Sequence, residues 1–269
     1  MKKKTLIIVA VIIIGIIVAL LIIGKQDSNK TIRTNSGEVI SNKKIGWGIR
    51  RNDNHNQPDL GRNNKKLIDE NEDIAMGNTT DKYIYLTFDE GYEAGYTPQI
   101  LDILKENNVK AAFFITGHYL NTQPELVERM IEEGHIVGNH TVNHPSMPDL
   151  DNDKLKEEIT TLHIAVYEKF GYEMKYLRPP KGEFSERTLA LTKSLGYTTV
   201  MWSFAYDDWD ESKQGRENYA KEKILSNVHN GAVMLLHANS KDNTNILAEI
   251  IKNIKEQGYE FKTLDEFKR

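Results

Sequence analysis

From about residue 81 onward, short continuous apolar runs alternate with longer runs in which apolar residues recur at helical spacing. The first short run, at 83–88, is β-branched and aromatic and is bounded by polar residues, which is typical of a buried strand. Ile100, Leu101 and Leu104 share one face of the next run, which predicts a helix. The same pattern predicts further strands at 111–115, 135–137, 176–177, 198–202, 233–236 and 259–261, and helices at 98–107, 124–133, 155–170, 185–195, 220–228 and 246–254.

The strand–helix order repeats about seven times. Such a repeat predicts an α/β fold with a mostly parallel sheet and covering helices, closed into a barrel or nearly so. In folds of this kind the functional residues lie at the carboxyl ends of the strands. The core domain is therefore expected to span 81–269, with its chemistry at one edge of the sheet.

The chain opens with a different pattern, in which three lysines precede an uninterrupted apolar run at 6–24. At ~1.5 Å per residue this run gives about 28 Å of helix, close to the roughly 30 Å of a bilayer core. We interpret residues 1–25 as cytoplasmic lysines followed by an uncleaved transmembrane helix. A cleaved signal peptide is the alternative, but the run is long and lacks small residues in an A-x-A pattern. The lysines place the N-terminus inside, which puts the rest of the chain on the outer face of the membrane.

Residues 26–44 are polar and show no periodicity, which predicts a flexible tether. The next segment, 45–80, places Trp47 among glycines and is expected to pack on the domain as an N-terminal strap. Arg50 and Arg51 in this strap could face an anionic substrate, or they could simply be solvated basic residues.

The composition of the chain excludes several classes of partner and of active site. The chain has 269 residues, 39% of them hydrophobic, enough to bury one large core. Its formal net charge of −4 argues against a nucleic-acid partner. It has no cysteine, which excludes disulfides, cysteine nucleophiles and thiolate metal sites. The oligomeric state is left open.

Polar side chains of unusual type follow the predicted strands. If the strands are parallel, all of these side chains reach one face of the sheet. They are Asp89 and Glu90 after the first strand, His140 and His144 after the third, Arg178 after the fourth, Asp207 and Asp208 after the fifth, and His237 after the sixth.

His140 and His144 are four residues apart in a predicted turn and could reach one cation. A carboxylate from Glu90 or Asp89 would complete a trio of ligands with open positions for water, as in a hydrolytic metal site. Neighbouring residues of a strand point to opposite sides, so one of these acids could serve as a base while the other faces the metal. The alternative is a pair of surface or core histidines. The other histidines lack a partner at this spacing and are interpreted as structural or solvated: His55, His118, His135, His163 and His229.

Two further groups suggest acid–base chemistry. Arg178 would hold the carboxylate of Asp89 ionised, as a base requires, although it could also be an ordinary surface arginine. A carboxylate at 207–208 would raise the pKa of His237, which suits a proton donor to a leaving amine.

Five segments in order carry a resemblance: TFDEG at 87–91, HTVNHP at 140–145, RPPKG at 178–182, DW at 208–209 and LLH at 235–237. From about residue 83 to 267 the chain resembles the polysaccharide deacetylase family, also called the NodB-homology or carbohydrate esterase 4 family. This resemblance implies a distorted, incomplete (β/α)7–8 barrel. Residues 47–48, 77–79, 91–97 and 177–180 more narrowly resemble the delta-lactam-biosynthetic de-N-acetylases of spore-forming bacteria.

The resemblance also implies roles for individual residues. It makes Asp89 the base, oriented by Arg178, and His237 the acid, oriented by Asp208. It implies one divalent metal ion, with Zn²⁺ the choice that imidazole and carboxylate ligands favour. The implied metal ligands are His140, His144 and Glu90, and the implied substrate contacts are Tyr92, Pro180, Trp209 and Leu235. Most of the family has Asp at the position of Glu90, so this ligand departs from the family pattern.

By resemblance, the expected function is metal-dependent removal of the N-acetyl group from N-acetylmuramic acid in peptidoglycan, leading to muramic delta-lactam in spore cortex. The expected location is the cell membrane, crossed once, with the catalytic domain on the outer face or in the space between the two forespore membranes. One alternative is a peptidoglycan N-acetylglucosamine deacetylase. Another is a membrane-tethered glycan-binding protein with a catalytically weak centre, which the change at Glu90 makes conceivable.

Overall fold

The computed structural model describes residues 32, 37, 39–52 and 54–269. The predicted transmembrane helix at 6–24 lies outside these residues. No helix within the described ranges combines the length and the hydropathy needed to span a bilayer.

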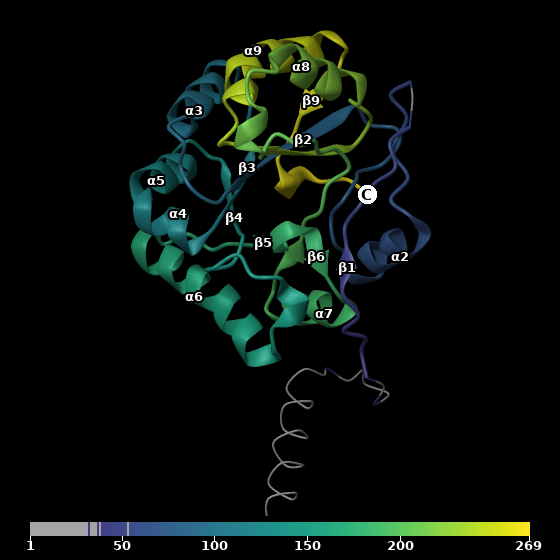
Figure 1. Ribbon diagram of the computed structural model, residues 1–269, viewed down its shortest axis with the longest axis vertical. Coiled ribbons are helices and arrows are strands. Elements are labelled where there is room, and N and C mark those ends of the chain that lie inside the picture. The colour runs from purple at the N-terminus through teal and green to yellow at the C-terminus, as the bar shows by residue number, and fades with distance from the viewer. Residues whose placement is uncertain (1–31, 33–36, 38, 53) are drawn as a thin grey trace, which may run out of the picture.

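A parallel sheet organises the fold, and its strand β2 (Tyr83–Glu90) pairs with three other strands (Figure 1). On one side of β2 lie β3 (Ala112–Ile115), β4 (Ile136–Asn139), β5 (Tyr176–Leu177) and β7 (Thr198–Thr199), in that order. On the other side lies β8 (Ala232–His237), and β9 (Glu260–Phe261) pairs with the first residues of β2. The predicted α/β class and parallel sheet are confirmed.

Helices cover the outer side of this sheet along an arc (Figure 1). They are α3 (Thr97–Glu106), α4 (Gly117–Thr122), α5 (Pro124–Glu132), α6 (Asn152–Phe170), α7 (Glu186–Ser194), α8 (Glu217–Ser226) and α9 (Lys241–Glu256). Apolar side chains from the sheet and helices form the main core, in which the rings of Phe88 and Phe113 stack with centroids 5.2 Å apart. Short 3-10 turns occur at η1 (Met147–Asp149), η2 (Pro180–Gly182), η3 (Glu211–Lys213) and η4 (Leu264–Glu266).

The N-terminal strap packs against both ends of the sheet. Its strand β1 (Ile45–Gly46) pairs antiparallel with β6 (Glu183–Phe184), and it contains a helix, α2 (Arg62–Asn71), that the sequence pattern did not predict. Single bridges join Ile74 to Val200 and Met76 to Ala232. The strap thus lies between β7 and β8, the two strands at the ends of the sheet order.

This arrangement corrects one predicted strand. The run at 198–202 was expected to be one strand, but β7 ends at Thr199. Beyond it, Val200 bridges to Ile74, and the amide of Met201 donates to the carbonyl of Ile74 over 2.7 Å. A strand that turns from its sheet neighbour to a segment distant in sequence leaves no local signal in the apolar pattern.

The predicted boundary of the flexible tether is also wrong at its C-terminal end. The carbonyl of Ser41 accepts from the amide of Arg187, and Asn42 accepts from the hydroxyl of Ser185 at 2.9 Å. Lys44 forms an ion pair with Asp149 at 2.7 Å. Residues 41–44 therefore belong to the folded domain.

Candidate active site

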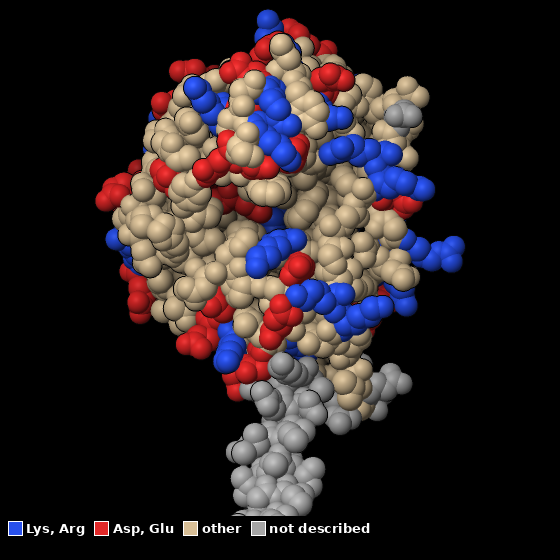
Figure 2. Space-filling view, in the orientation of Figure 1, with Lys and Arg blue, Asp and Glu red and all other residues tan. Residues whose placement is uncertain are grey.

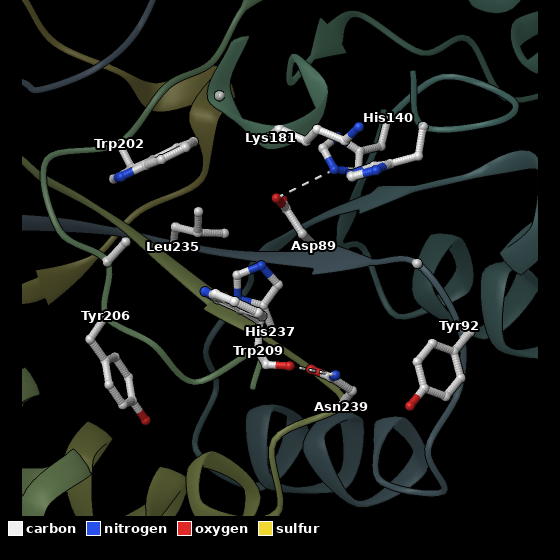
Figure 3. Close-up of a pocket in the computed structure, with 14 residues that line it drawn as sticks. Asp89, Tyr92, His140, Lys181, Trp202, Tyr206, Trp209, Leu235, His237 and Asn239 are labelled. Atoms are coloured by element: carbon white, nitrogen blue, oxygen red, sulfur yellow. Dashed lines mark hydrogen bonds and ion pairs between the residues drawn. The ribbon is translucent and has the colours of Figure 1, made fainter. Parts of the chain in front are cut away.

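The register of β2 and β8 brings two predicted catalytic residues together. Asp89 is paired directly with His237 on the neighbouring strand and with Phe114 on the other side. Because paired residues of parallel strands project to the same face of a sheet, the carboxylate and the imidazole both reach the cavity shown in Figure 3.

Arg178 anchors the carboxylate of Asp89. Its Nη1 donates to Oδ1 of Asp89 over 2.8 Å. Its other nitrogens donate to the hydroxyl of Thr87 and to the carbonyls of Val200 and Met201. The guanidinium is completely buried, yet every nitrogen has a partner, which is the condition for a buried charge to be tolerated.

A ring on the neighbouring strand supports this guanidinium. The Arg178 Cζ lies 4.2 Å from the centroid of Phe114, within cation–π range. Phe114 in turn needs Gly138 beside it, because a Cβ at position 138 would lie 2.5 Å from the ring. The site is therefore supported by apolar residues that carry no chemical motif of their own.

These contacts fix the ionisation of Asp89. Burial alone would raise its pKa, but the charge of Arg178 and its hydrogen bond to the carboxylate hold the pKa below the ordinary value. Asp89 is thus a carboxylate at neutral pH and can accept a proton.

His237 is coupled to a second buried carboxylate. Its Nδ1 donates to Oδ1 of Asp208 over 2.9 Å, and its backbone amide donates to Oδ2 over 2.8 Å. Asn243, in the first turn of α9, donates to the same Oδ2. Burial would lower the pKa of His237, but the Asp208 carboxylate outweighs this effect and raises it. Asp207, the neighbouring acid, instead pairs with Lys213 at 2.9 Å.

His140 and His144 form the pair that the sequence predicted. Their rings lie 4.8 Å apart between centroids. The Nδ1 of His140 donates to the carbonyl of Arg178 over 2.8 Å, which leaves its Nε2 free, 3.5 Å from Oδ2 of Asp89. Burial lowers the pKa of both histidines, that of His144 to about 4. Both rings are neutral at pH 7, the form that binds a metal ion.

Glu90 does not join this pair. Its side chain is buried on the opposite side of β2, where Oε1 accepts from the hydroxyl of Thr97 over 3.3 Å and Oε2 has no hydrogen-bond partner. Burial and the nearby charge of Glu93 raise its pKa well above the ordinary value. The structure does not bring Glu90 to the histidines, because adjacent strand residues point to opposite faces and Asp89 lies on the face of His140. Within the described ranges, no group of three candidate ligands could hold a metal ion.

A cavity of about 520 Å³ lies over these residues. Figure 2 shows the corresponding face hollowed near its centre, with charged side chains around the hollow. The cavity is lined by Asp89, Gly91, Tyr92, His140, His144, Lys181, Gly182, Trp202, Ala205, Tyr206, Trp209, Leu235, His237 and Asn239.

Three of the four predicted substrate contacts line this cavity: Tyr92, Trp209 and Leu235. Pro180 does not. It is buried in the turn η2, directly before Lys181. Trp209 and Tyr92 are 58% and 44% exposed, and Figure 3 shows the Tyr92 ring apart from the other labelled rings. Exposed rings of this size beside a cavity suit the flat faces of sugar rings.

Proteins of known family are similar in sequence to this chain. The model of the polysaccharide deacetylase family matches residues 76–200. The chain is 44% identical over 230 residues to the peptidoglycan-N-acetylmuramic acid deacetylase PdaA of Bacillus subtilis, covering 85% of this chain and 88% of that protein. The chain belongs to the polysaccharide deacetylase family.

The solved structures extend this result to the fold. The structure of Bacillus subtilis PdaA, a family 4 carbohydrate esterase, matches with a TM-score of 0.82 over 85% of this chain and 98% of that chain.

A second relative differs in the sugar that its name gives. A peptidoglycan-N-acetylglucosamine deacetylase of Bacillus cereus is 35% identical in sequence over 192 residues, covering 70% of this chain and 89% of that protein. The family resemblance, the deacetylase class of enzyme and the incomplete α/β barrel are therefore confirmed.

Several site residues of this deacetylase were not predicted from its sequence. Trp202 and Tyr206 line the cavity from the segment after β7, and Asn239 lines it after β8. Asn243 carries a weak signal, since it lies six residues beyond the strand-end His237, where a helix begins. Phe114 and Gly138 carry none, because buried apolar residues look alike in sequence.

The Asp208–His237 contact predicts a titration effect. Replacing Asp208 by Asn removes the charge that raises the pKa of His237, so this pKa should fall in the variant. NMR titration of the imidazole measures it directly. Asp207→Asn is the matched control, because Asp207 pairs with Lys213 and should leave the His237 titration unchanged. Equal pKa values for His237 in Asp208→Asn and in the parent protein would contradict the assignment.

Proposed function

We propose that this protein removes the N-acetyl group from N-acetylmuramic acid residues of peptidoglycan. The observation that carries the chemistry is the placement of a carboxylate base, Asp89, directly beside an imidazole acid, His237, on neighbouring strands at the floor of a cavity. The choice of sugar is supported by the 44% identity to PdaA, which covers most of both chains.

Asp89 would act as the general base. Amide hydrolysis requires water to lose a proton as it attacks the acetyl carbonyl, and an ionised carboxylate can accept that proton. Arg178 keeps Asp89 ionised and fixes its Oδ1, which leaves Oδ2 on the side of His140 to face water.

His237 would act as the general acid. After the carbonyl carbon becomes tetrahedral, the bond to nitrogen breaks only if the departing amine receives a proton. The raised pKa of His237 keeps its imidazole protonated to higher pH, and the bond from Nδ1 to Asp208 turns Nε2 toward the cavity. Arg178 and Asp208 are thus positioning residues for Asp89 and His237.

His140 and His144 would hold a divalent cation, for which Zn²⁺ matches two neutral imidazoles. Such a cation would act as a Lewis acid and polarise the acetyl carbonyl. The bond from Nδ1 of His140 to the Arg178 carbonyl is the type of support that orients imidazole ligands. Glu90, on the other side of the strand, would not contribute.

The further consequences of this function are also proposals. The freed amine of muramic acid can close onto its lactyl carboxyl group with loss of water, which yields muramic delta-lactam, the modified sugar of spore cortex. The segment at 6–24 would tether the domain to the outer face of a membrane, at the cell surface or between the forespore membranes, where peptidoglycan lies.

One alternative has a specific observation in its favour. The 35% identity to an N-acetylglucosamine deacetylase shows that a relative with a related sequence carries that activity by name. Both sugars present the same acetamido group, so the groups that act on it do not distinguish them.

Mass spectrometry of digested glycan strands tests the choice of sugar. Strands incubated with the enzyme should lose acetyl groups from muramic acid units, and Asp89→Asn should slow this loss by ~10²–10⁴-fold, because a general base is removed while its shape is kept. Acetyl loss confined to glucosamine units would transfer the assignment to the alternative. A near-parental rate in Asp89→Asn would overturn the role of the base.

Metal analysis tests the ligand set independently of activity. Purified His140→Ala should lose most of its bound divalent cation, whereas Glu90→Gln should retain it, because His140 lines the cavity and Glu90 does not. The Gln variant keeps the shape of Glu90 and removes its charge. If Glu90→Gln lost the cation to the same extent as His140→Ala, Glu90 would be a ligand and its observed orientation would not be the one that binds metal.

A further inference from the structure

We propose that Lys181 binds the lactyl carboxylate of muramic acid and thereby selects this sugar over glucosamine. This inference rests on the proposed function and deepens it, because the groups that act on the acetamide cannot discriminate between the two sugars. The lactyl ether is attached to the carbon next to the one that bears the acetamido group. The residue that recognises it must therefore lie beside the reaction centre.

Lys181 lies in that position. It lines the cavity from the turn η2, on the same side as His140 in Figure 3. The same cavity is lined by both imidazoles, those of His140 and His144. Among the described residues that line the cavity, Lys181 is the only lysine or arginine.

The charge of Lys181 is available to a substrate. The two carboxylates at the centre already have cationic partners, Arg178 for Asp89 and His237 for Asp208. Outside the cavity, the charge of Lys181 helps to lower the pKa of Asp149 and that of Glu183. Both carboxylates form ion pairs with Lys44, at 2.7 Å and 3.4 Å.

The backbone holds Lys181 in an unusual conformation. Its φ of 60° and ψ of 7° lie in the left-handed region, which residues with a Cβ adopt only at a cost. The next residue, Gly182, also has a positive φ, of 63°. Such strain persists only where the surroundings determine the conformation fully.

The N-terminal strap supplies that constraint. The amide of Trp47 donates to the carbonyl of Gly182 over 2.8 Å. A Cβ on Gly182 would lie 2.7 Å from the ring of Trp202 and 3.2 Å from Cβ of Trp47. The turn is thus fixed between two tryptophans, and this packing directs the side chain of Lys181 to the cavity.

The other cations considered for this role are engaged elsewhere. Arg50 is exposed and forms an ion pair with Asp59 at 2.9 Å. The guanidinium of Arg51 donates to the carbonyl of Ala205 and lies over the ring of Phe204. Neither arginine lines the cavity.

The experiment compares two substrates that differ only in charge. One is a glycan fragment with free muramic lactyl carboxylates, and the other is the same fragment with each carboxylate converted to its methylamide. The parent enzyme should prefer the free carboxylate by about 10- to 100-fold in kcat/KM, the range of a charge-assisted hydrogen bond. Lys181→Gln should lose this preference, mainly through a higher KM for the carboxylate form, with the methylamide rate unchanged.

Three further variants sharpen the result. Lys181→Arg should keep the preference because it keeps the charge. Lys181→Gly, which the positive φ favours, should fold at least as well as the parent and should lose the preference. Arg50→Gln, an exposed cation outside the cavity, should behave as the parent.

The outcomes separate this inference from the proposed function. If Lys181→Gln and Lys181→Gly slow the reaction of both substrates equally, or if the preference for the free carboxylate survives in these variants, Lys181 does not bind the carboxylate. The inference then falls while the proposed function stands. If the parent enzyme deacetylates only glucosamine units, the proposed function fails and the inference falls with it.

Discussion

The buried ion pair between Arg178 and Asp89 is the interaction on which the rest of the site depends. It joins the end of β5 to the end of β2 across two intervening strands, so it forms only when the parallel sheet is complete. Two carbonyls after β7 and the hydroxyl of Thr87 satisfy the remaining donors of the guanidinium. Removing one partner of such a pair leaves an uncompensated buried charge, which typically costs about 3–5 kcal/mol. This contact thus makes the ionisation of the base depend on the completed sheet.

The N-terminal strap has a larger part in this arrangement than its sequence indicates. Ile74 pairs with the residues just after β7, whose carbonyls accept from Arg178, and Trp47 holds the turn that carries Lys181. The strap therefore supports both sides of the cavity, the one that hydrolyses the amide and the one that would recognise the lactyl group. This explains why a segment without catalytic residues packs so closely on the domain.

The sequence predicted the alternation of strands and helices along the chain and most of the residues at the site, because both depend on local patterns. Parallel strands place their carboxyl ends at one edge, so the positions of Asp89, His140, Arg178 and His237 after apolar runs were sufficient to bring them together. The alternation of side chains along β2 shows that Asp89 and Glu90 face opposite sides, but it does not show which of the two faces the histidines. The support of Arg178 by Phe114 and the early end of β7 depend on contacts between distant segments, which leave no periodic signal.

The pH dependence of kcat/KM in Arg178→Gln tests the central claim most directly. If Arg178 keeps Asp89 ionised, its removal leaves burial to raise the pKa of Asp89, and the acidic limb of the profile should move to higher pH. Arg187→Gln is the matched control, since Arg187 is also buried but binds Asn152 and the carbonyl of Leu150. An acidic limb that stays at the parental pH in a folded Arg178→Gln protein, with only the maximum rate reduced, would contradict the account.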